Sequence, residues 1–153
     1  MGKSNEPIWR QAVNHMLHFS FALKAEIEAR LGEELGFGLA DHEALINIHL
    51  HDAELKMSDL AEQLVLSRGG ITKLVDRLET AGYLRRAPSA EDRRVTKVEI
   101  TANGIDVVTR SRAVIDEIVT QRFASRITED EAQFMKDLIR RAYHDEESTL
   151  VEE

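Results

Sequence analysis

The order of three short patterns between residues 58 and 101 limits the fold of this chain more than any other feature. A short helical stretch covers about Asp59 to Leu64, and VLS then turns the chain into LSRGGITKLVDRLETAGYL, residues 66–84. In that segment an i, i+3, i+4, i+7 spacing predicts a helix with one buried stripe, made of Ile71, Leu74, Val75 and Leu78. Two alternating stretches, Tyr83–Ala87 and Val95–Ile100, are joined by the turn PSAEDR and indicate a β-hairpin. Together the patterns predict a winged helix-turn-helix.

Capping residues mark where these helices begin and end. Ser58 and Ser67 are the expected N-caps of the short helix and the amphipathic helix, and Gly82 is expected to end the latter. Thr101 is the expected cap of a long helix to about Phe123, whose apolar stripe comprises Ile105, Val108, Ile115, Ile118, Val119 and Phe123. A capping box at residues 128–131 opens a last helix, with Phe134, Met135, Leu138, Ile139, Ala142 and Tyr143 expected to face inward.

Helices also precede the winged segment. Pro7 suits the first turn of a helix to about Leu31, which is apolar on two sides and is therefore expected to pack against two bodies, its own core and a second subunit. Residues 32–38, GEELGFG, are predicted to form a loop, and a further helix to cover about Asp41 to Leu50. The predicted fold is mainly α with a small β-hairpin wing: a winged-helix lobe at 40–101 and dimerisation helices at 6–31 and 102–148.

Composition and charge exclude several classes of protein. The 153 residues contain no Cys, which excludes disulfides and cysteine nucleophiles and fits a reducing cytoplasm, and no apolar run approaches the roughly 20 residues of a membrane span. There is no Gly-rich phosphate loop and no Ser paired with a recognisable base, so we expect neither an enzyme nor a bound cofactor. The net charge is −8, yet the segment from Arg68 to Lys97 has eight basic and four acidic residues. A basic segment in an acidic chain favours a nucleic-acid partner, although a solvated charged patch is an equal alternative on charge alone.

With these patterns in order, the chain resembles the MarR family of bacterial transcription regulators over essentially its whole length. The resemblance rests on MSDLAEQLVLS, on GGITKLVDRLETAGYL and on the wing EDRRVTKVEIT. Ala40 departs from the family, which usually has a capping Ser or Thr there. The resemblance implies a homodimeric repressor that binds operator DNA and is released by a small aromatic or anionic effector. A two-fold dimer further implies a pseudo-palindromic operator with half-sites about 10 bp apart.

The amphipathic helix would present its N-terminal residues and its free face to the major groove. We expect DNA contacts from Ser67, Arg68, Gly69, Gly70, Thr72, Lys73 and Arg77. Arg68 has the donors for a guanine and Thr72 a methyl for a thymine, whereas Lys73 and Arg77 suit phosphates. At the wing tip lie Asp92, Arg93 and Arg94. The family resemblance implies that Arg94 enters the minor groove and that Asp92 holds an Arg in place; two solvated arginines are the alternative.

Two consecutive glycines stand in the first turn of this helix, where each costs about 1 kcal/mol relative to Ala. Gly69 and Gly70 lack Cβ atoms and would let the helix start approach a phosphate closely. The alternative is that they only loosen the helix start. The two readings predict different effects on DNA affinity when the glycines are replaced.

The remaining hypotheses concern an effector, a metal and a rival function. By analogy with the family, His15, Phe19 and His42 are expected to line an effector crevice between the dimer helices and the DNA-binding lobe. We favour solvated or hydrogen-bonded histidines over a metal site. The serious rival to the regulator is a winged-helix module that contacts only proteins, which salt-dependent duplex binding would exclude.

Overall fold

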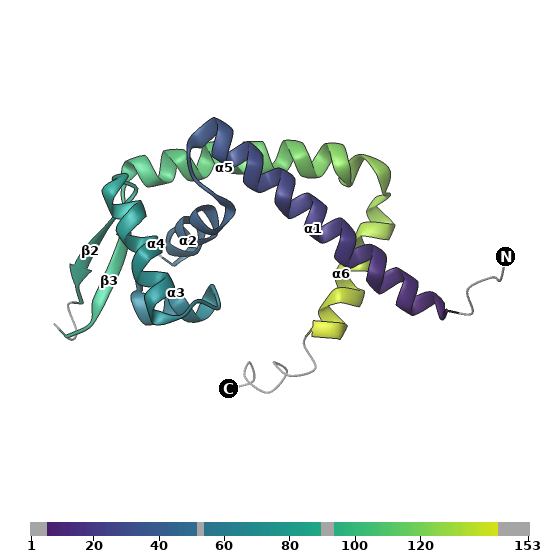
Figure 1. The fold of residues 1–153 in the computed structure, drawn as a ribbon, viewed down its shortest axis with the longest axis horizontal. Helices are drawn as coiled ribbons and strands as arrows, with labels where there is room; N and C mark the ends of the chain where they lie inside the picture. Colours follow the sequence, from purple (N-terminus) through teal and green to yellow (C-terminus); the bar gives the residue numbers. More distant parts are fainter. Residues whose placement is uncertain (1–5, 52–53, 90–93, 144–153) are drawn as a thin grey trace. The chain divides into compact units, whose positions relative to one another are not determined.

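The computed structural model describes residues 6–51, 54–89 and 94–143. The elements in chain order (Figure 1) are α1 Ile8–Leu35, α2 Leu39–Leu50, β1 Glu54–Lys56, α3 Met57–Gln63, α4 Arg68–Thr80, β2 Leu84–Pro88, β3 Thr96–Ile100, α5 Ala102–Arg122, the 3₁₀ turn η1 Ala124–Arg126 and α6 Glu129–Tyr143. The chain divides after Ile118 into two compact units. The mainly helical fold with a β-hairpin wing is confirmed. None of the described helices is both long enough and apolar enough to cross a lipid bilayer.

The sheet of the first unit has a strand that the sequence patterns did not predict. Its order is β1-β3-β2, with both pairs antiparallel. Val98 of β3 is buried and lies opposite Leu55 on one side and Arg86 on the other. With three residues, β1 is too short to show an alternating pattern, and only its pairing with β3 defines it as a strand.

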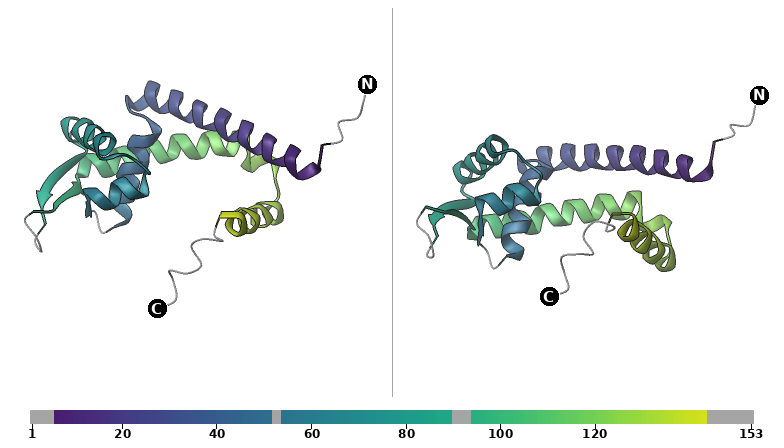
Figure 2. Two further views of the ribbon diagram at one scale, coloured as in Figure 1. Left: turned by 60° about the horizontal axis from the view of Figure 1, so that its bottom comes forward. Right: turned by 90° about the horizontal axis from the view of Figure 1, so that it is seen from below.

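One apolar core joins α2, α3, α4, the sheet and the start of α5. Its buried members are Phe37, Ala44, Leu45, Ile48, Leu55, Leu60, Ile71, Leu74, Val75, Leu78, Leu84, Val98, Val107 and Val108. Phe37, Val107 and Val108 lie just outside the predicted lobe limits of 40–101. A second cluster packs the C-terminal half of α1 on α5 through Ile27, Leu31, Val114 and Ile118, and the two helices lie alongside each other in Figure 2.

Three local predictions for the first unit were wrong, two on helix boundaries and one on a buried stripe. Residues 32–35 continue α1 instead of forming a loop, and the helix ends at Gly36, which adopts a left-handed φ of 71°. α3 begins at Met57 with Lys56 as its N-cap, because the Ser58 hydroxyl donates to Asp59 Oδ1 at 2.8 Å instead of capping the helix. On α5, the predicted stripe residue Ile105 is exposed, whereas Val107 and Val114 are buried.

Other local predictions are confirmed. Gly82 follows α4 with a φ of 76°, and Thr101 Oγ1 accepts from Gly104 N at 3.1 Å, which caps α5. At the start of α6, Thr128 N donates to Glu131 Oε2 at 2.8 Å and Glu131 N donates to Thr128 Oγ1 at 3.3 Å, the reciprocal bonds of a capping box. These features depend on residues within a few positions of one another.

The second unit, with η1 and α6, leaves several large apolar residues of α6 exposed within one chain. Phe134, Leu138 and Ile139 had been expected to face inward, yet Phe134 is 62% exposed and the other two are also exposed. Within α1, the N-terminal half is similar: Trp9 is 60% exposed, and Val13, Met16 and Leu17 are exposed as well. Large exposed apolar faces mark surfaces that are covered by a partner.

Candidate nucleic-acid interface

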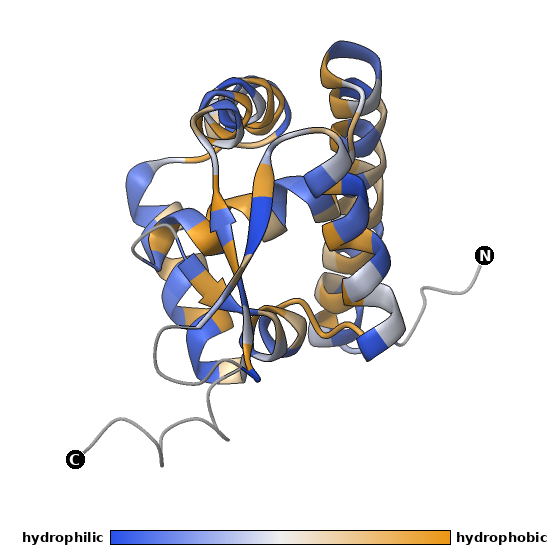
Figure 3. Ribbon diagram, turned by 90° about the vertical axis from the view of Figure 1, so that its left-hand side faces the viewer, coloured by the Kyte–Doolittle hydropathy of each residue, from blue (hydrophilic) through white to orange (hydrophobic). Residues whose placement is uncertain are grey.

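The amphipathic helix α4 is built as the sequence predicts, with one buried stripe and one exposed face. Ser67 caps it, its Oγ accepting from Gly70 N at 3.1 Å. The four stripe residues, Ile71, Leu74, Val75 and Leu78, are all buried. Figure 3 shows apolar and polar segments alternating along the helices of this lobe, as expected for helices with one face on a core. The capped N-terminus and the polar face are therefore the parts of α4 open to a ligand.

Cationic and methyl groups lie on this open part. Arg68, Thr72 and Lys73 are exposed, as predicted. The Thr72 hydroxyl donates to the Arg68 carbonyl oxygen at 2.8 Å within the helix. Because the hydroxyl is turned to the backbone, the Thr72 methyl is available for an apolar contact, the group that a thymine methyl would meet.

The two glycines of the first turn have different surroundings. Neither has a positive φ, so neither needs to be glycine for its backbone conformation. A Cβ at Gly69 would meet nothing within 4 Å, whereas a Cβ at Gly70 would lie 3.3 Å from Ser67 Oγ. Gly70 therefore packs against the N-cap and has a structural role. Gly69 faces open space and has no such role.

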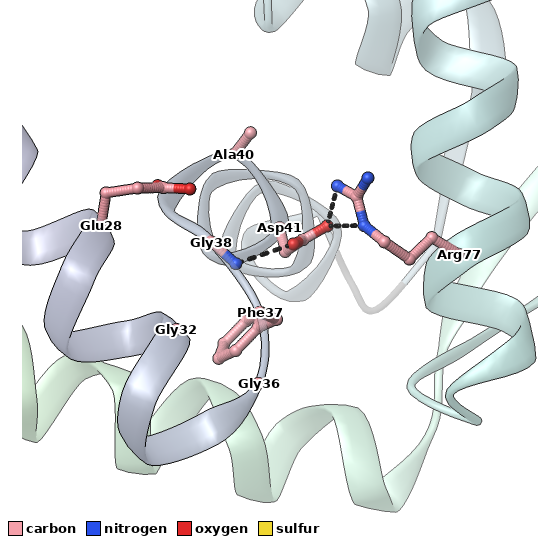
Figure 4. Close-up of a pocket in the computed structure, with 8 residues that line it drawn as sticks. All are labelled: Glu28, Gly32, Gly36, Phe37, Gly38, Ala40, Asp41 and Arg77. Atoms are coloured by element: carbon pink, nitrogen blue, oxygen red, sulfur yellow. Dashed lines mark hydrogen bonds and ion pairs between the residues drawn. The ribbon is translucent and has the colours of Figure 1, made fainter.

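Arg77, which is predicted to contact a phosphate, has an ion-pair partner within the chain. Its guanidinium does not stand free: Nε and Nη2 donate to Asp41 Oδ1 at 3.0 and 2.5 Å (Figure 4). Asp41 is 3% exposed, and its other oxygen accepts from Gly38 N at 2.9 Å, which caps α2. The sequence patterns predict Asp41 only as the start of a helix, because its partner lies 36 positions further along the chain.

The opposite flank of α4 is held to the wing. Arg86 of β2 donates through Nη2 to Asp76 Oδ1 at 2.5 Å and through Nη1 to Glu79 Oε2. The backbone N–H of Arg86 also donates to Glu79 Oε1 at 3.0 Å. Asp76, which is exposed on α4, is thus engaged as well. Ion pairs on both flanks, one to Asp41 and two to Arg86, fix the helix between α2 and the hairpin.

The wing residues are only partly described. Asp92 and Arg93 lie outside the described residues, and Arg94 is exposed at the start of the described part. Behind them the hairpin is cross-linked on its surface: Lys97 Nζ bonds Glu54 Oε1 at 2.6 Å, and Arg85 Nε bonds Glu99 Oε2 at 2.7 Å. Strand β3 therefore has charged contacts to both of its neighbouring strands, β1 and β2.

The residues predicted to line an effector crevice are not gathered in the cavity that the structure describes. His15 and Phe19 are exposed on α1. His42 is half-buried and its Nδ1–H donates to Ser111 Oγ at 2.7 Å, because that hydroxyl itself donates to Val108 O. Burial is the main cause that lowers the pKa of His42, with Arg112 adding to it and Asp116 opposing it.

The described cavity has a volume of about 400 Å³ and lies at the junction of α1, α2 and α4 (Figure 4). It is lined by Glu28, Gly32, Gly36, Phe37, Gly38, Ala40, Asp41 and Arg77. The prediction that His15, Phe19 and His42 form a site stays a prediction.

Comparison with known proteins identifies the relatives of this chain. The model of the MarR family matches residues 35–95. The transcriptional regulator MhqR of Bacillus subtilis is 30% identical over 102 residues, which is 64% of this chain and 67% of MhqR. Two structures from Streptomyces coelicolor share the fold: the regulator AbsC, with a TM-score of 0.81 at 20% identity over 92% of this chain and 95% of AbsC, and the regulator Sco3205 in complex with DNA, with a TM-score of 0.79 at 21% identity over 91% of each chain.

The fold defines a winged helix-turn-helix protein. Its helix α4 is held by ion pairs on both flanks, and the N-terminus of α4 is exposed and carries two cations. The chain belongs to the MarR family of transcriptional regulators. The relatives named above are transcriptional regulators, not enzymes.

Proposed function

We propose that this protein is a homodimeric, sequence-specific DNA-binding repressor that acts in the cytoplasm. The observation that carries the proposal is the start of α4, where a hydroxyl-capped helix N-terminus, an open glycine and two exposed cations lie together. Backbone amides and the positive end of the helix dipole favour a phosphate there. A winged helix that contacts only proteins does not need these groups.

Each exposed residue has a distinct role in this proposal. Arg68 donates to a guanine edge, the Thr72 methyl packs on a thymine, and Lys73 meets a phosphate. Gly69 and the capped turn of Ser67 and Gly70 allow close approach to the backbone of the duplex. In the wing, Arg94 enters the minor groove with Arg93 beside it and Asp92 orienting them, as the family resemblance implies. Arg77 is left out, since Asp41 engages it.

The exposed apolar faces support the homodimer. Residues on the N-terminal half of α1 and on α6 are exposed in one chain, among them Trp9 and Phe134. We propose that 6–31 and 102–148 form the dimer interface and that 40–101 is the DNA-binding lobe. Two lobes related by a two-fold axis would read a pseudo-palindromic operator.

An effector would act by binding better to the form of the dimer that does not fit the operator. We propose a small aromatic or anionic effector near His15, Phe19 and His42. Supporting this placement, His42 is half-buried and connects α2 of the lobe to α5 through Ser111. A compound that binds both forms equally would leave DNA affinity unchanged.

The DNA-binding proposal is tested by selecting bound duplexes from random DNA and titrating the enriched duplex at several salt concentrations. We expect a two-fold symmetric consensus and an affinity that falls steeply with salt, because each phosphate contact releases a counterion. Absence of enrichment together with salt-independent binding would favour the protein-contact module instead.

The dimer proposal is tested by Leu138→Asp, with Lys136→Asp on the same helix as the control. A carboxylate in an apolar interface is strongly unfavourable, so we expect the first variant to sediment as a monomer and the second as a dimer. Leu138→Asp that remains a folded dimer would show that α6 does not form the interface.

A further inference from the structure

The geometry points to Asp41 as a positioning residue for DNA recognition: its ion pair with Arg77 holds helix α4 at the angle that fits the groove, so Arg77 acts as a tether and not as a phosphate ligand. This inference rests on the proposed DNA-binding function. It assigns a role to a residue of α2 that lies outside the helix-turn-helix and the wing.

The first observation is that both oxygens of the Asp41 carboxylate accept hydrogen bonds. Oδ2 accepts from Gly38 N, which fixes the first turn of α2, and Oδ1 accepts two bonds from Arg77. Asp41 is 3% exposed. A buried carboxylate requires a compensating partner, and a bond through both Nε and Nη2 fixes the direction of the guanidinium as well as its position. Arg77 is therefore held in one pose from a rigid helix start.

The second observation is where Arg77 lies on α4. At 100° per residue, Arg77 is on the flank of the exposed face, whereas Gly69 and Lys73 lie nearer its centre. Glu79 lies on the opposite flank and Asp76 lies between that flank and the centre, and both are bound to Arg86 of the wing. Arg77 thus ties one flank to α2, as Glu79 and Asp76 tie the other to the hairpin. A helix held on both flanks cannot roll in the groove without breaking an ion pair.

The third observation is the link between α2 and α1. The backbone N–H of Leu39 donates to Glu28 Oε2 of α1 at 2.7 Å, and a Cβ at Gly38 would lie 2.4 Å from the other oxygen of this carboxylate. The start of α2 is therefore fixed from α1 while Asp41 holds Arg77. The tether therefore sets the angle of α4 relative to α1. Because α1 is one of the proposed dimer helices, the tether would also set the angle of α4 relative to the two-fold axis.

The experiment compares Asp41→Asn, Arg77→Gln and the double variant with Lys73→Gln as a matched control. Lys73 is an exposed cation one turn earlier on α4 and has no hydrogen bond or ion pair among the described residues. For each protein, the affinity for the enriched duplex and for an unrelated duplex is measured over a range of salt. Wild-type binding tests the proposed function by itself, and differences among the variants test the tether.

We expect Asp41→Asn and Arg77→Gln each to lower affinity for the enriched duplex by about tenfold, a change of the size caused by one mismatched base pair. Affinity for the unrelated duplex and the salt slope should stay near wild type, and the double variant should be no worse than either single variant. Lys73→Gln should instead lower both affinities and reduce the salt slope by about one.

Two results would overturn the inference. In the first, Arg77→Gln behaves like Lys73→Gln while Asp41→Asn tightens binding, which makes Arg77 a phosphate ligand that Asp41 restrains. In the second, neither change alters specific affinity. Should Arg77→Gln fail to fold because it leaves Asp41 without its cation, Asp41→Asn decides alone, since Arg77 is 58% exposed and remains solvated without its partner.

Discussion

The first turns of α4 and α5 have the same local design and different surroundings. In both, a hydroxyl caps the helix and the N3 residue is glycine: Ser67 accepts from Gly70 N, and Thr101 accepts from Gly104 N, each at 3.1 Å. A Cβ at Gly104 would lie 2.1 Å from the Tyr83 carbonyl oxygen, whereas one at Gly70 would lie 3.3 Å from Ser67 Oγ.

Thr101 also has a second bond that Ser67 lacks, since its hydroxyl donates to Gly82 O at 2.7 Å. The start of α5 is packed into the fold, and the start of α4 is open to solvent. A glycine in the first turn of a capped helix therefore has no fixed role. Its neighbours in space decide whether it serves packing or an external ligand.

The largest effect should come from Gly104→Ala. The new methyl would overlap the Tyr83 carbonyl and Ile100 Cγ1, and neither the backbone nor this partly buried strand end can move away without a loss of packing. We expect a loss of about 2–3 kcal/mol in the free energy of unfolding, the upper range of overpacking, measured by urea titration. A variant as stable as wild type would show that the start of α5 is not tightly packed.

Removal of the two capping hydroxyls should lower the free energy of unfolding by amounts that differ about twofold. Thr101→Ala removes both the cap of α5 and the bond to Gly82 O in a half-buried place, so we expect a loss of about 2 kcal/mol. Ser67→Ala removes only an exposed cap and should cost about 1 kcal/mol. The measurement is thermal unfolding of both variants under one condition, and equal losses would contradict the contrast between the two helix starts.

Gly69→Ala should raise stability and lower DNA affinity. With nothing within 4 Å of the added Cβ, the gain in helix propensity is about 1 kcal/mol, or about 2–4 °C in melting temperature for a chain of this size. The methyl stands on the face proposed to meet the duplex, so affinity for the enriched duplex should fall. Raised stability with unchanged affinity would mean that Gly69 only loosens the helix.

The smallest effect should come from Gly70→Ala, which serves as the control for Gly69→Ala. Its Cβ would press on Ser67 Oγ, so the gain in propensity is offset by a weakened cap. We expect a net change within about 0.5 kcal/mol, as for most substitutions without a specific mechanism. A stabilisation as large as that of Gly69→Ala would show that the Ser67 cap accommodates the added Cβ without an energetic cost.

Local features could be predicted from the sequence because their partners are near in the chain. The buried stripe of α4, the caps Ser67 and Thr101, the capping box at Thr128 and the left-handed Gly82 all depend on spacing within one or two turns. The same patterns, taken in order, predicted the winged helix-turn-helix, since few folds accommodate that succession.

Features with distant partners could not be predicted. β1 is a strand only because β3 lies beside it, and Arg77 is a tether only because Asp41 lies next to it in space. The conformation of Val65 could not be predicted either. Val65 lies in the turn between α3 and α4, is 92% exposed and has a φ of 52°, which is unfavourable for a β-branched residue.

Local patterns in the sequence thus predict the helices, their order and several of their ends, because short-range hydrogen bonds and apolar periodicity define them. The tertiary structure sets which charged side chains stay open to a ligand and which glycines are packed. These depend on contacts between segments that are far apart in the chain, which no local pattern records.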